Sequence, residues 1–553
     1  MKLCDYIACL IKKNESIVTG IPGYPIMPIW NSVSQIHDII LACHESGAAY
    51  IADGWSRITH KAAFVLTTVG PGQTNVFSGI ASAYKDNIPL ICITGQNNID
   101  TYLKGPFQNS WDIDRGFSVT SVFKNITKYC AEITNIETAK DIIDYAVKIS
   151  LTGRKGPVLL SIPMNIQMEE INNIKSKEKY NVTLKNDFHT HIRQTKEICV
   201  NSLINDSLRP LLLIGWGSYC SNAKDQIYEL AKKLNAPIIS TIKGKSIVPQ
   251  DCCYWGHVGS GMSKTTQENL KRYNPDLMIC LGASLSGYYM DLIDPFVKKS
   301  KLIQIDIDES QLGLFYPVDI GISDDVCSWI KNNLDYLYEK ETKRNTKYNL
   351  VENIPDNYLM GRSIKYINDN FSSSIIVPDA GNHWLDTLFL CTNVSNELFT
   401  NSGLGIMGHA IGSSIGMSLA LKNSKKIICI TGDGSCLLNL WAAQKIIGDG
   451  SFLMNGNEII SAQKYNCNMI FIIYNNSSLG RVRTFQVQHN QMTCSSNIAN
   501  VNFQMLCNSF NVKSYRVRSL EEFKQAFNYE FNKIRLSVIE VIVSKEEMPL
   551  CML

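Results

Sequence analysis

The chain has 553 residues, of which 45% are hydrophobic and 19% are charged. This composition supports large buried cores and excludes a wholly disordered chain, and the length predicts three or four domains. Lys and Arg exceed Asp and Glu by 53 − 50 = 3, a balance that argues against a nucleic-acid partner. No apolar run approaches the ~20 residues of a membrane span, so no membrane association is expected.

The N-terminal segment and the cysteines favour a cytoplasmic location. Residues 1–18 are expected to form an amphipathic helix, because they lack the basic start and the small-residue cleavage site of a signal peptide. The 18 cysteines are scattered and include no C-x-x-C pair, which is typical of a reducing compartment.

Short runs rich in Ile, Val and Leu alternate with longer amphipathic segments. Runs this apolar predict strands buried on both faces, and the helices between them indicate βαβ units in parallel sheets. The runs lie at 62–68, 89–95, 157–163, 210–217, 276–282, 301–308, 425–432 and 469–476.

Two charged stretches, at about 171–191 and 338–357, interrupt this alternation. Charged segments without strand signals are typical of linkers. We therefore predict an α/β protein with three doubly wound parallel-sheet domains, at 1–170, 192–337 and 358–553.

The segment 44–57 predicts a helix that begins at Glu45 and has a small apolar face of alanines. An acidic residue at this position can simply complement the helix dipole. Alternatively, a partly buried Glu45 carboxyl could share a proton with a ring nitrogen of a ligand.

A glycine-rich run, NSGLGIMGHAIGSSIG, occupies 401–416. Its small residues permit the backbone to approach a flat ligand closely, with Met407 wedged beneath a heterocycle. A glycine-dense helix start with Met407 in the core would produce the same pattern.

A second glycine-rich motif precedes the strand that ends near Asn476, and it consists of Gly448, Asp449, Gly450 and Ser451. The 476 − 449 = 27 positions between Asp449 and Asn476 accommodate a loop, a helix and a strand, so both oxygens should reach one carboxyl edge of a parallel sheet. A carboxylate oxygen of Asp449 and the amide oxygen of Asn476 are ligands that Mg²⁺ prefers. The glycines would let backbone N–H groups at a helix start approach a diphosphate. Alternatively, the Asp-Gly and Asn-Asn sequences form two ordinary turns that are unrelated to each other and bind no ligand.

The Gly-Asp-Gly-Ser motif occurs twice, with a first copy at 432–435, 16 residues before the second. The first copy follows the better strand, whereas the second has the expected spacing to Asn476. Asp433 is 476 − 433 = 43 positions from Asn476 and would need an extra loop. The spacing therefore favours Asp449, and the repeat also leaves open a weakened or absent cofactor site.

Together these motifs resemble the thiamin diphosphate enzymes of the acetolactate synthase and pyruvate oxidase group. The resemblance spans nearly the whole chain, because the matching segments follow the family order. They are GIPGYPIMPIW (20–30), HESGAAYIADGWSR (44–57), TTVGPGQTNVFSGIASAYKDNIPLICITGQ (67–96), GRKGPVLLSIPMNIQ (153–167), IDIDESQLG (305–313), GLGIMG (403–408), GDGSFLMNG (448–456) and NNSSLG (475–480).

The resemblance implies an N-terminal pyrimidine-binding domain, a central domain and a C-terminal diphosphate-binding domain. It also implies a homodimer or homotetramer in which Glu45 and Asp449 meet across a subunit interface, and it is compatible with a regulatory small subunit.

Cofactor contacts can be carried over by position. Glu45 matches the family's glutamate that hydrogen-bonds the aminopyrimidine ring of thiamin diphosphate. Met407 matches the wedge that bends the cofactor, with the Gly405 backbone facing the pyrimidine. Asn382 and His383 resemble a Gly-Gln-His stretch near the diphosphate, with Asn in place of Gln.

Metal and substrate contacts follow in the same way. Asp449, Asn476 and the Ser478 carbonyl match the Mg²⁺ ligands. Phe107-Gln108 occupies the place of a Phe-Gln pair near the substrate, although Asn109 replaces the Glu that usually follows. We expect Gln108 to donate a hydrogen bond to the carbonyl of the acceptor substrate.

Two other regions differ from the family pattern. Segments 215–217, 256–263 and 282–289 resemble those that line FAD in some members, but the last lacks the expected Arg, so bound FAD and an empty groove both remain open. In segment 480–488, which covers the active site in the family, Thr484-Phe485 replaces Gln-Trp. The substrate can therefore differ.

The resemblance implies a carboligase that decarboxylates pyruvate or a related 2-oxo acid and transfers the two-carbon unit to a second carbonyl compound. One alternative is a non-ligating decarboxylase or lyase acting on a 2-oxo acid or an acyl-CoA. Another is a catalytically impaired homologue with a structural role, which the repeated motif would favour.

Overall fold

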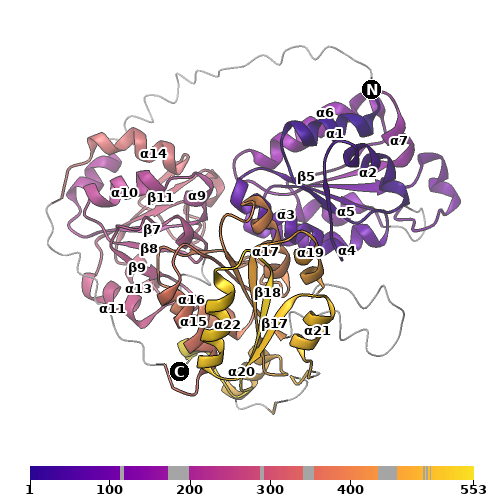
Figure 1. Cartoon of the computed structure of the whole chain (residues 1–553). Coiled ribbons are helices and arrows are strands. Elements are labelled where there is room, and N and C mark those ends of the chain that lie inside the picture. The colour runs from indigo at the N-terminus through magenta and orange to yellow at the C-terminus, as the bar shows by residue number, and fades with distance from the viewer. Residues whose placement is uncertain are drawn as a thin grey trace. The chain divides into compact units, whose positions relative to one another are not determined.

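The computed structural model describes the chain except for residues 112–116, 172–198, 287–289, 291, 341–353, 434–456, 490–491, 494–495, 499 and 553 (Figure 1). The chain forms two compact units. The first unit comprises Met1–Ile174, Ile375–Trp384 and Asn401–Glu547, and the second comprises Lys175–Ser374, Leu385–Thr400 and Met548–Leu553. The two predicted linkers lie largely outside the described residues.

Three parallel six-stranded sheets confirm the predicted fold class. The N-terminal sheet has the order β2-β1-β3-β4-β6-β5, the central sheet β12-β11-β10-β7-β8-β9, and the C-terminal sheet β14-β13-β15-β16-β18-β17. Every predicted apolar run forms a strand, because each is long enough to cross a sheet and apolar enough to be buried on both faces.

The N-terminal sheet consists of β1 (Val18–Gly20), β2 (Ile39–Leu41), β3 (Ala63–Thr67), β4 (Leu90–Gln96), β5 (Tyr129–Glu132) and β6 (Val158–Pro163). Its helices are α1 (Leu3–Lys13), α2 (Met27–Ser34), α3 (Glu45–Thr59), α4 (Pro71–Asp86), α5 (Val119–Phe123), α6 (Ile136–Leu151) and α7 (Met164–Met168).

The central sheet consists of β7 (Pro210–Ile214), β8 (Ile238–Ser240), β9 (Tyr254–His257), β10 (Leu277–Leu281), β11 (Lys301–Asp306) and β12 (Ile320–Ser323). Its helices include α9 (Trp216–Cys220), α10 (Lys224–Lys233), α11 (Lys264–Tyr273), α13 (Asp294–Val297) and α14 (Val326–Asn333), and α15 (Leu359–Asn370) follows.

The C-terminal sheet consists of β13 (Ile375–Pro378), β14 (Glu397–Leu398), β15 (Ile427–Gly432), β16 (Met469–Asn475), β17 (Lys513–Val517) and β18 (Ser537–Ile542). Its helices include α16 (Asn382–Leu390), α17 (His409–Ala420), α19 (Glu458–Lys464), α20 (Gly480–Gln488), α21 (Phe503–Ser509) and α22 (Leu520–Phe531).

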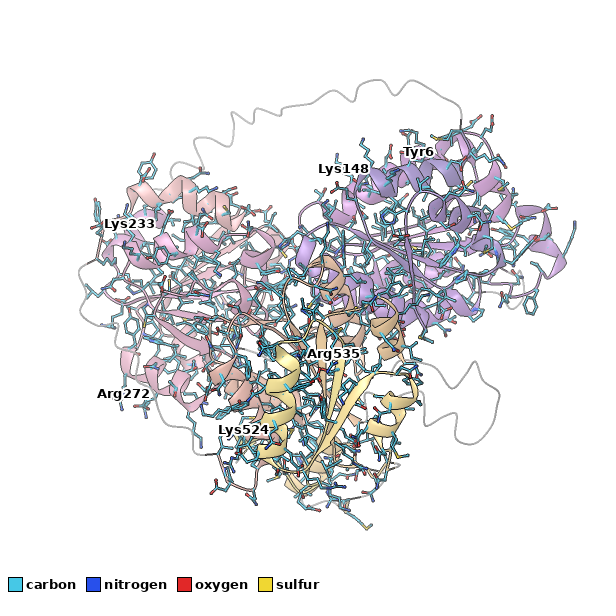
Figure 2. All side chains as sticks on the ribbon, viewed as in Figure 1. Tyr6, Lys148, Lys233, Arg272, Lys524 and Arg535 are labelled. Carbon is cyan, nitrogen blue, oxygen red and sulfur yellow. The ribbon has the colours of Figure 1, made fainter. Side chains whose placement is uncertain are left out.

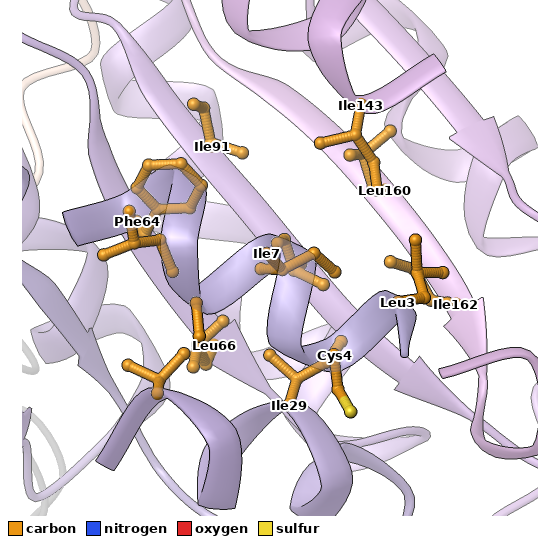
Figure 3. Close-up of a cluster of buried hydrophobic side chains, with 14 of the residues drawn as sticks. Leu3, Cys4, Ile7, Ile29, Phe64, Leu66, Ile91, Ile143, Leu160 and Ile162 are labelled. Atoms are coloured by element: carbon orange, nitrogen blue, oxygen red, sulfur yellow. The ribbon is translucent and has the colours of Figure 1, made fainter. Parts of the chain in front are cut away.

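Helices cover both faces of the N-terminal sheet. On one face, α1, α2 and α6 pack on the strands through a cluster of aliphatic side chains and one phenylalanine, including Leu3, Ile7, Ile29, Phe64, Leu66, Ile91, Ile143, Leu160 and Ile162 (Figure 3). On the other face, the Thr19 hydroxyl of β1 donates to the Ala48 carbonyl of α3 at 2.8 Å. This two-sided burial is what a doubly wound sheet requires.

Charged side chains lie on the outer helix faces. Lys148 of α6 and Arg272 of α11 are exposed there (Figure 2). None of the described helices is long and apolar enough to cross a membrane.

Within the first unit, α3 and α17 pack against each other at very short range. A Cβ atom on Gly54 would lie 1.9 Å from the Ser413 carbonyl oxygen, and one on Gly416 would lie 1.9 Å from the Ile51 carbonyl oxygen. Only glycine allows two backbones to approach this closely. The contact joins the helix that begins at Glu45 to the helix that follows Met407.

Candidate functional site

Glu45 is the first residue of α3, and its side chain is 7% exposed. The Asn75 amide of α4 donates to Glu45 Oε2 at 3.0 Å. His44 caps the helix, because its Nδ1 accepts the Ser46 backbone N–H at 3.2 Å, and burial lowers the pKa of His44. The Glu45 carboxyl is therefore held by one amide in a largely buried position.

Gln108 lies against the start of α4. A Cβ atom on Gly70, the residue before the helix, would lie 2.9 Å from the Gln108 carbonyl oxygen. Gly70 and Asn75 are separated by about 8 Å along the helix axis, at 1.5 Å per residue. The first turns of α4 thus contact both Glu45 and Gln108, while the Phe107 ring is 86% exposed.

Asp433 and Asn476 meet at the carboxyl edge of the C-terminal sheet. The Asn476 backbone N–H donates to Asp433 Oδ2 at 3.1 Å, and the Ser478 N–H donates to Asn476 Oδ1 at 3.0 Å. The pairing of Gly432 with Tyr474 brings the ends of β15 and β16 side by side. Gly432 and Asp433 of the first motif copy therefore lie at the end of β15, beside Asn476.

The second copy of the motif, Gly448, Asp449, Gly450 and Ser451, lies outside the described residues. Its predicted proximity to Asn476 is consequently untested. The expectation that Asp433 would need an extra loop to reach Asn476 also concerns residues 434–456, outside the described part of the chain.

Asn382 and His383 begin α16 at the same edge. The Asn382 Nδ2 donates to the Thr484 hydroxyl at 2.9 Å, while Asn382 Oδ1 is buried with no hydrogen-bond partner among the described residues. A Cβ atom on Gly480 would lie 3.1 Å from Asn476 Nδ2 and 3.3 Å from Asn382 Nδ2. The structure therefore gathers Asn382 and Asn476 around the start of α20.

His383 lies beside Gly432, where a Cβ atom would be 3.0 Å from the ring carbon Cε1. Burial lowers the pKa of His383 to about 4. The imidazole is neutral at pH 7 and can donate or accept a hydrogen bond without adding charge.

The oxygen atoms at this edge suit a hard cation that brings further ligands with it. No cluster of three or more His, Cys, Asp or Glu side chains able to hold a metal occurs among the described residues. The Asp433 carboxylate and the Asn476 amide oxygen are the kinds of oxygen that Mg²⁺ prefers, and Mg²⁺ usually takes only one or two protein ligands alongside phosphates and water.

The loop before α17 presents an open backbone surface. Gly405 has φ +66°, and no atom lies within 4 Å of the position that a Cβ would occupy. The Asn401 Oδ1 accepts the Gly405 N–H at 2.7 Å, and Asp379 Oδ2 accepts the Gly408 N–H at 2.7 Å. Half-buried Met407 thus lies between two glycines whose N–H groups are hydrogen-bonded.

A buried ionic network connects the same loop to helices α3 and α4 of the N-terminal domain. Arg57 donates to Asp53 Oδ1 at 2.5 Å and to Asp86 Oδ2 at 2.7 Å, and the Gly403 N–H donates to Asp86 Oδ1 at 3.0 Å. His409 Nε2 lies 3.1 Å from Asp53 Oδ1. Although burial opposes its charge, the two carboxylates raise the pKa of Arg57.

The sequence motifs do not identify Asp53, Asp86 and Asp379, which hold the loop before α17 and the residues around it. Asp53 and Arg57 occur at i and i+4 of the predicted helix, which is a readable signal for an ion pair. Asp379 directly follows the strand β13, where parallel sheets place ligand-binding residues. Nothing in the sequence pairs Asp86 with Gly403, because that contact joins residues 317 positions apart.

Three family models match the chain in order. The N-terminal TPP binding domain of thiamine pyrophosphate enzymes matches residues 1–115, and the central domain matches 199–332. The C-terminal TPP binding domain matches 379–447 and 442–541. Each of the latter two stretches contains one copy of the Gly-Asp-Gly-Ser motif.

Curated relatives match the chain over most of its length. A probable acetolactate synthase large subunit from Methanococcus aeolicus is 30% identical, over 95% of this chain and 89% of the relative. An acetolactate synthase large subunit from Lactococcus lactis is 26% identical, over 97% of this chain and 91% of the relative.

A solved structure shows the same fold. Benzoylformate decarboxylase from Polynucleobacter necessarius superposes with a TM-score of 0.79 at 20% identity, covering 99% of this chain and 100% of that chain.

Replacing Arg57 by Met should destabilise the first unit by about 3–5 kcal/mol, because two buried carboxylates lose their shared cation. Urea unfolding followed by circular dichroism measures this change. Lys61→Ala, which removes an exposed ion pair with Glu15, should change the stability little. If the two substitutions lowered the free energy of unfolding equally, the buried network would not stabilise the first unit as proposed.

Proposed function

The chain belongs to the thiamine pyrophosphate (thiamin diphosphate) enzyme family, and on that premise we propose that it is a Mg²⁺-dependent carboligase of the acetolactate synthase type. It would decarboxylate pyruvate or a related 2-oxo acid and transfer the two-carbon unit to a second carbonyl compound. The observation that carries this proposal is the gathering of Asp433, Asn476 and Asn382 at one sheet edge. The large-subunit names of the relatives add a regulatory small subunit to the proposal.

The residues fit the cofactor at both of its ends. The buried Asn382 Oδ1 and the glycine Gly432 lie at the carboxyl edge proposed to receive the diphosphate. The open side of Gly405 would accept the flat pyrimidine, with Met407 holding the cofactor bent. When bound, thiamin diphosphate supplies a carbon that attacks the 2-oxo acid and takes up the electron pair released by decarboxylation.

For the metal, we propose Asp433, Asn476 and the Ser478 carbonyl as ligands. The hydrogen bond from Asn476 to Asp433 supports this set, while Asp449 remains the alternative that the spacing in the sequence favours. The two matches of the C-terminal family model are compatible with either copy.

Glu45 is proposed to exchange a proton with the aminopyrimidine. Among the described residues, the hydrogen bond given for this largely buried carboxyl comes from the Asn75 amide to Oε2, which leaves Oε1 for a ring nitrogen. General acid–base transfer from a positioned carboxyl contributes about 10²–10⁴-fold to rate.

Gln108 is proposed to stabilise charge on the acceptor carbonyl. An amide can donate a hydrogen bond there without delivering a proton to the reacting carbon. A simple decarboxylase or lyase needs no such donor. Asn109 and the pair Thr484-Phe485 depart from the acetolactate pattern and are the features that favour this alternative.

The flavin proposal has less support. A Cβ atom on Gly215 would lie 2.1 Å from the Gly282 carbonyl oxygen, and one on Gly244 would lie 2.2 Å from the Ile214 carbonyl oxygen. These glycines allow the turns to pack against each other. If bound, FAD would have a structural role and would take no part in the proposed reaction.

We propose a homodimer or a pair of dimers as the active assembly. In it, Glu45 of one copy would contact a cofactor whose diphosphate is bound at the sheet edge of another copy. Phe77 and Tyr84 of α4 are 37% and 38% exposed, which supplies apolar surface on the helix that contacts Glu45.

Co-expression of Glu45→Gln chains with Asp433→Ala chains tests the shared site. Half of randomly formed dimers are mixed and keep one intact site of two, so about one quarter of the activity should return. Separately purified variants are the controls and should be inactive. A co-expressed preparation that stays inactive would place the whole site within one chain.

Asp433→Ala should abolish Mg²⁺-dependent binding of thiamin diphosphate, because a cation binding the diphosphate would lose its carboxylate ligand. Titration calorimetry with and without Mg²⁺ measures this loss. Asp449→Ala is the matched control and should bind nearly as the wild type does. The reverse ranking would assign the metal to the second copy.

Incubation with pyruvate, thiamin diphosphate and Mg²⁺ tests the carboligase itself. Acetolactate or acetoin should exceed acetaldehyde in the products, and Gln108→Ala should shift them toward acetaldehyde, since ligation loses its hydrogen-bond donor. Acetaldehyde alone from the wild type would favour the decarboxylase. Absence of all products, with bound cofactor, would favour an impaired homologue.

A further inference from the structure

Glu458 reaches from α19 of the C-terminal domain to the N-terminus of α3. Its side chain is buried, and Oε1 accepts the backbone N–H groups of Cys43 at 2.9 Å and His44 at 3.2 Å. These two donors immediately precede Glu45. The proposed proton-transfer residue is therefore approached by a carboxylate more than four hundred positions away in the chain.

The contact is specific in its geometry. A Cβ atom on Gly47 would lie 2.1 Å from Glu458 Oε1, so the carboxyl occupies the space that a side chain at residue 47 would fill. Cys43 adds two contacts to α19, from Sγ to the Asn457 carbonyl at 3.4 Å and to the Ser461 hydroxyl at 3.6 Å. The chain entering α3 is thus fixed on several sides.

The first N–H groups at a helix start lack partners within the helix. In α3, His44 satisfies the Ser46 N–H, and Glu458 satisfies the two N–H groups before the helix. A negative charge at this end is also favoured by the helix dipole. Burial nevertheless raises the pKa of Glu458 to about 7, although both backbone donors favour the carboxylate.

We propose that Glu458 is a positioning residue for Glu45, setting the path of residues 43 and 44 so that the Glu45 carboxyl points toward the cofactor ring. This inference rests on the proposed role of Glu45. Glu458 itself is directed at backbone amides, so it acts through Glu45. The contact also connects α19 of the C-terminal domain to the start of α3 in the N-terminal domain.

The first arm of the test uses cofactor-free protein, in which hydrogen–deuterium exchange reports the Cys43 and His44 amides. Glu458→Ala should speed their exchange, whereas Glu458→Gln, which keeps a carbonyl acceptor, should protect them as the wild type does. Glu530→Ala removes an equally buried carboxylate whose partners are Tyr515 and Arg535, and should leave these amides protected. Should Glu458→Ala not fold, Glu458→Asp, one methylene shorter, replaces it.

The second arm loads each variant with thiamin diphosphate and Mg²⁺ and measures exchange of the thiazolium C2 proton. Glu458→Ala should slow it by about 10–100-fold, the cost of misplacing a catalytic group, while Glu458→Gln restores it. Unchanged amide protection or an unchanged C2 rate in Glu458→Ala would overturn the inference, as would equal losses in Glu530→Ala. If the C2 proton of thiamin diphosphate bound to the wild type exchanged no faster than that of free cofactor, the proposed function would be contradicted. The protection of the Cys43 and His44 amides would then be the only test of whether Glu458 positions residues 43 and 44.

Discussion

The close contact between α3 and α17 is the constraint on which the rest of the first unit depends. Backbones at Gly54 and Gly416 approach so closely that no side chain fits between them, and Arg57 lies beside this contact with two aspartate partners. A misplaced helix would leave buried charges without their partners, which is costly. The network therefore permits essentially one relative placement of the two helices.

That placement has consequences for both proposed halves of the site. Glu45 begins α3, and Met407 lies two residues before α17, so each is fixed by the helix that it adjoins. Asp86 extends the same network to Gly403, and Asp379 anchors the other end of the loop. Glu458 adds a third connection, to the residues preceding Glu45. Rigid support of this kind is what positions catalytic groups within fractions of an ångström.

The sequence predicts the fold, and it also predicts which residues lie at the carboxyl edge of the C-terminal sheet. Runs such as 469–476 are apolar along their whole length, so strands buried on both faces were predictable. Asn382 and Asn476 follow directly on strands or on the turns after them, and parallel strands bring such residues together. The spacing to Asn476 does not by itself separate Asp433 from Asp449, because a loop can change in length without moving the strands that it connects. The contact of Glu458 with residues 43 and 44 and that of Asp86 with Gly403 could not be predicted, since the donors are backbone N–H groups, which any residue other than proline provides.

We propose that Glu45, held at the start of α3, moves a proton on the cofactor. The most direct test is the rate at which the thiazolium C2 proton of bound thiamin diphosphate exchanges with solvent deuterium, followed by NMR after acid quench, in the wild type and in Glu45→Gln. We predict slower exchange in the variant by about 10²-fold or more, the scale of general acid–base catalysis, with cofactor affinity retained. An unchanged exchange rate in cofactor-loaded Glu45→Gln would contradict this account.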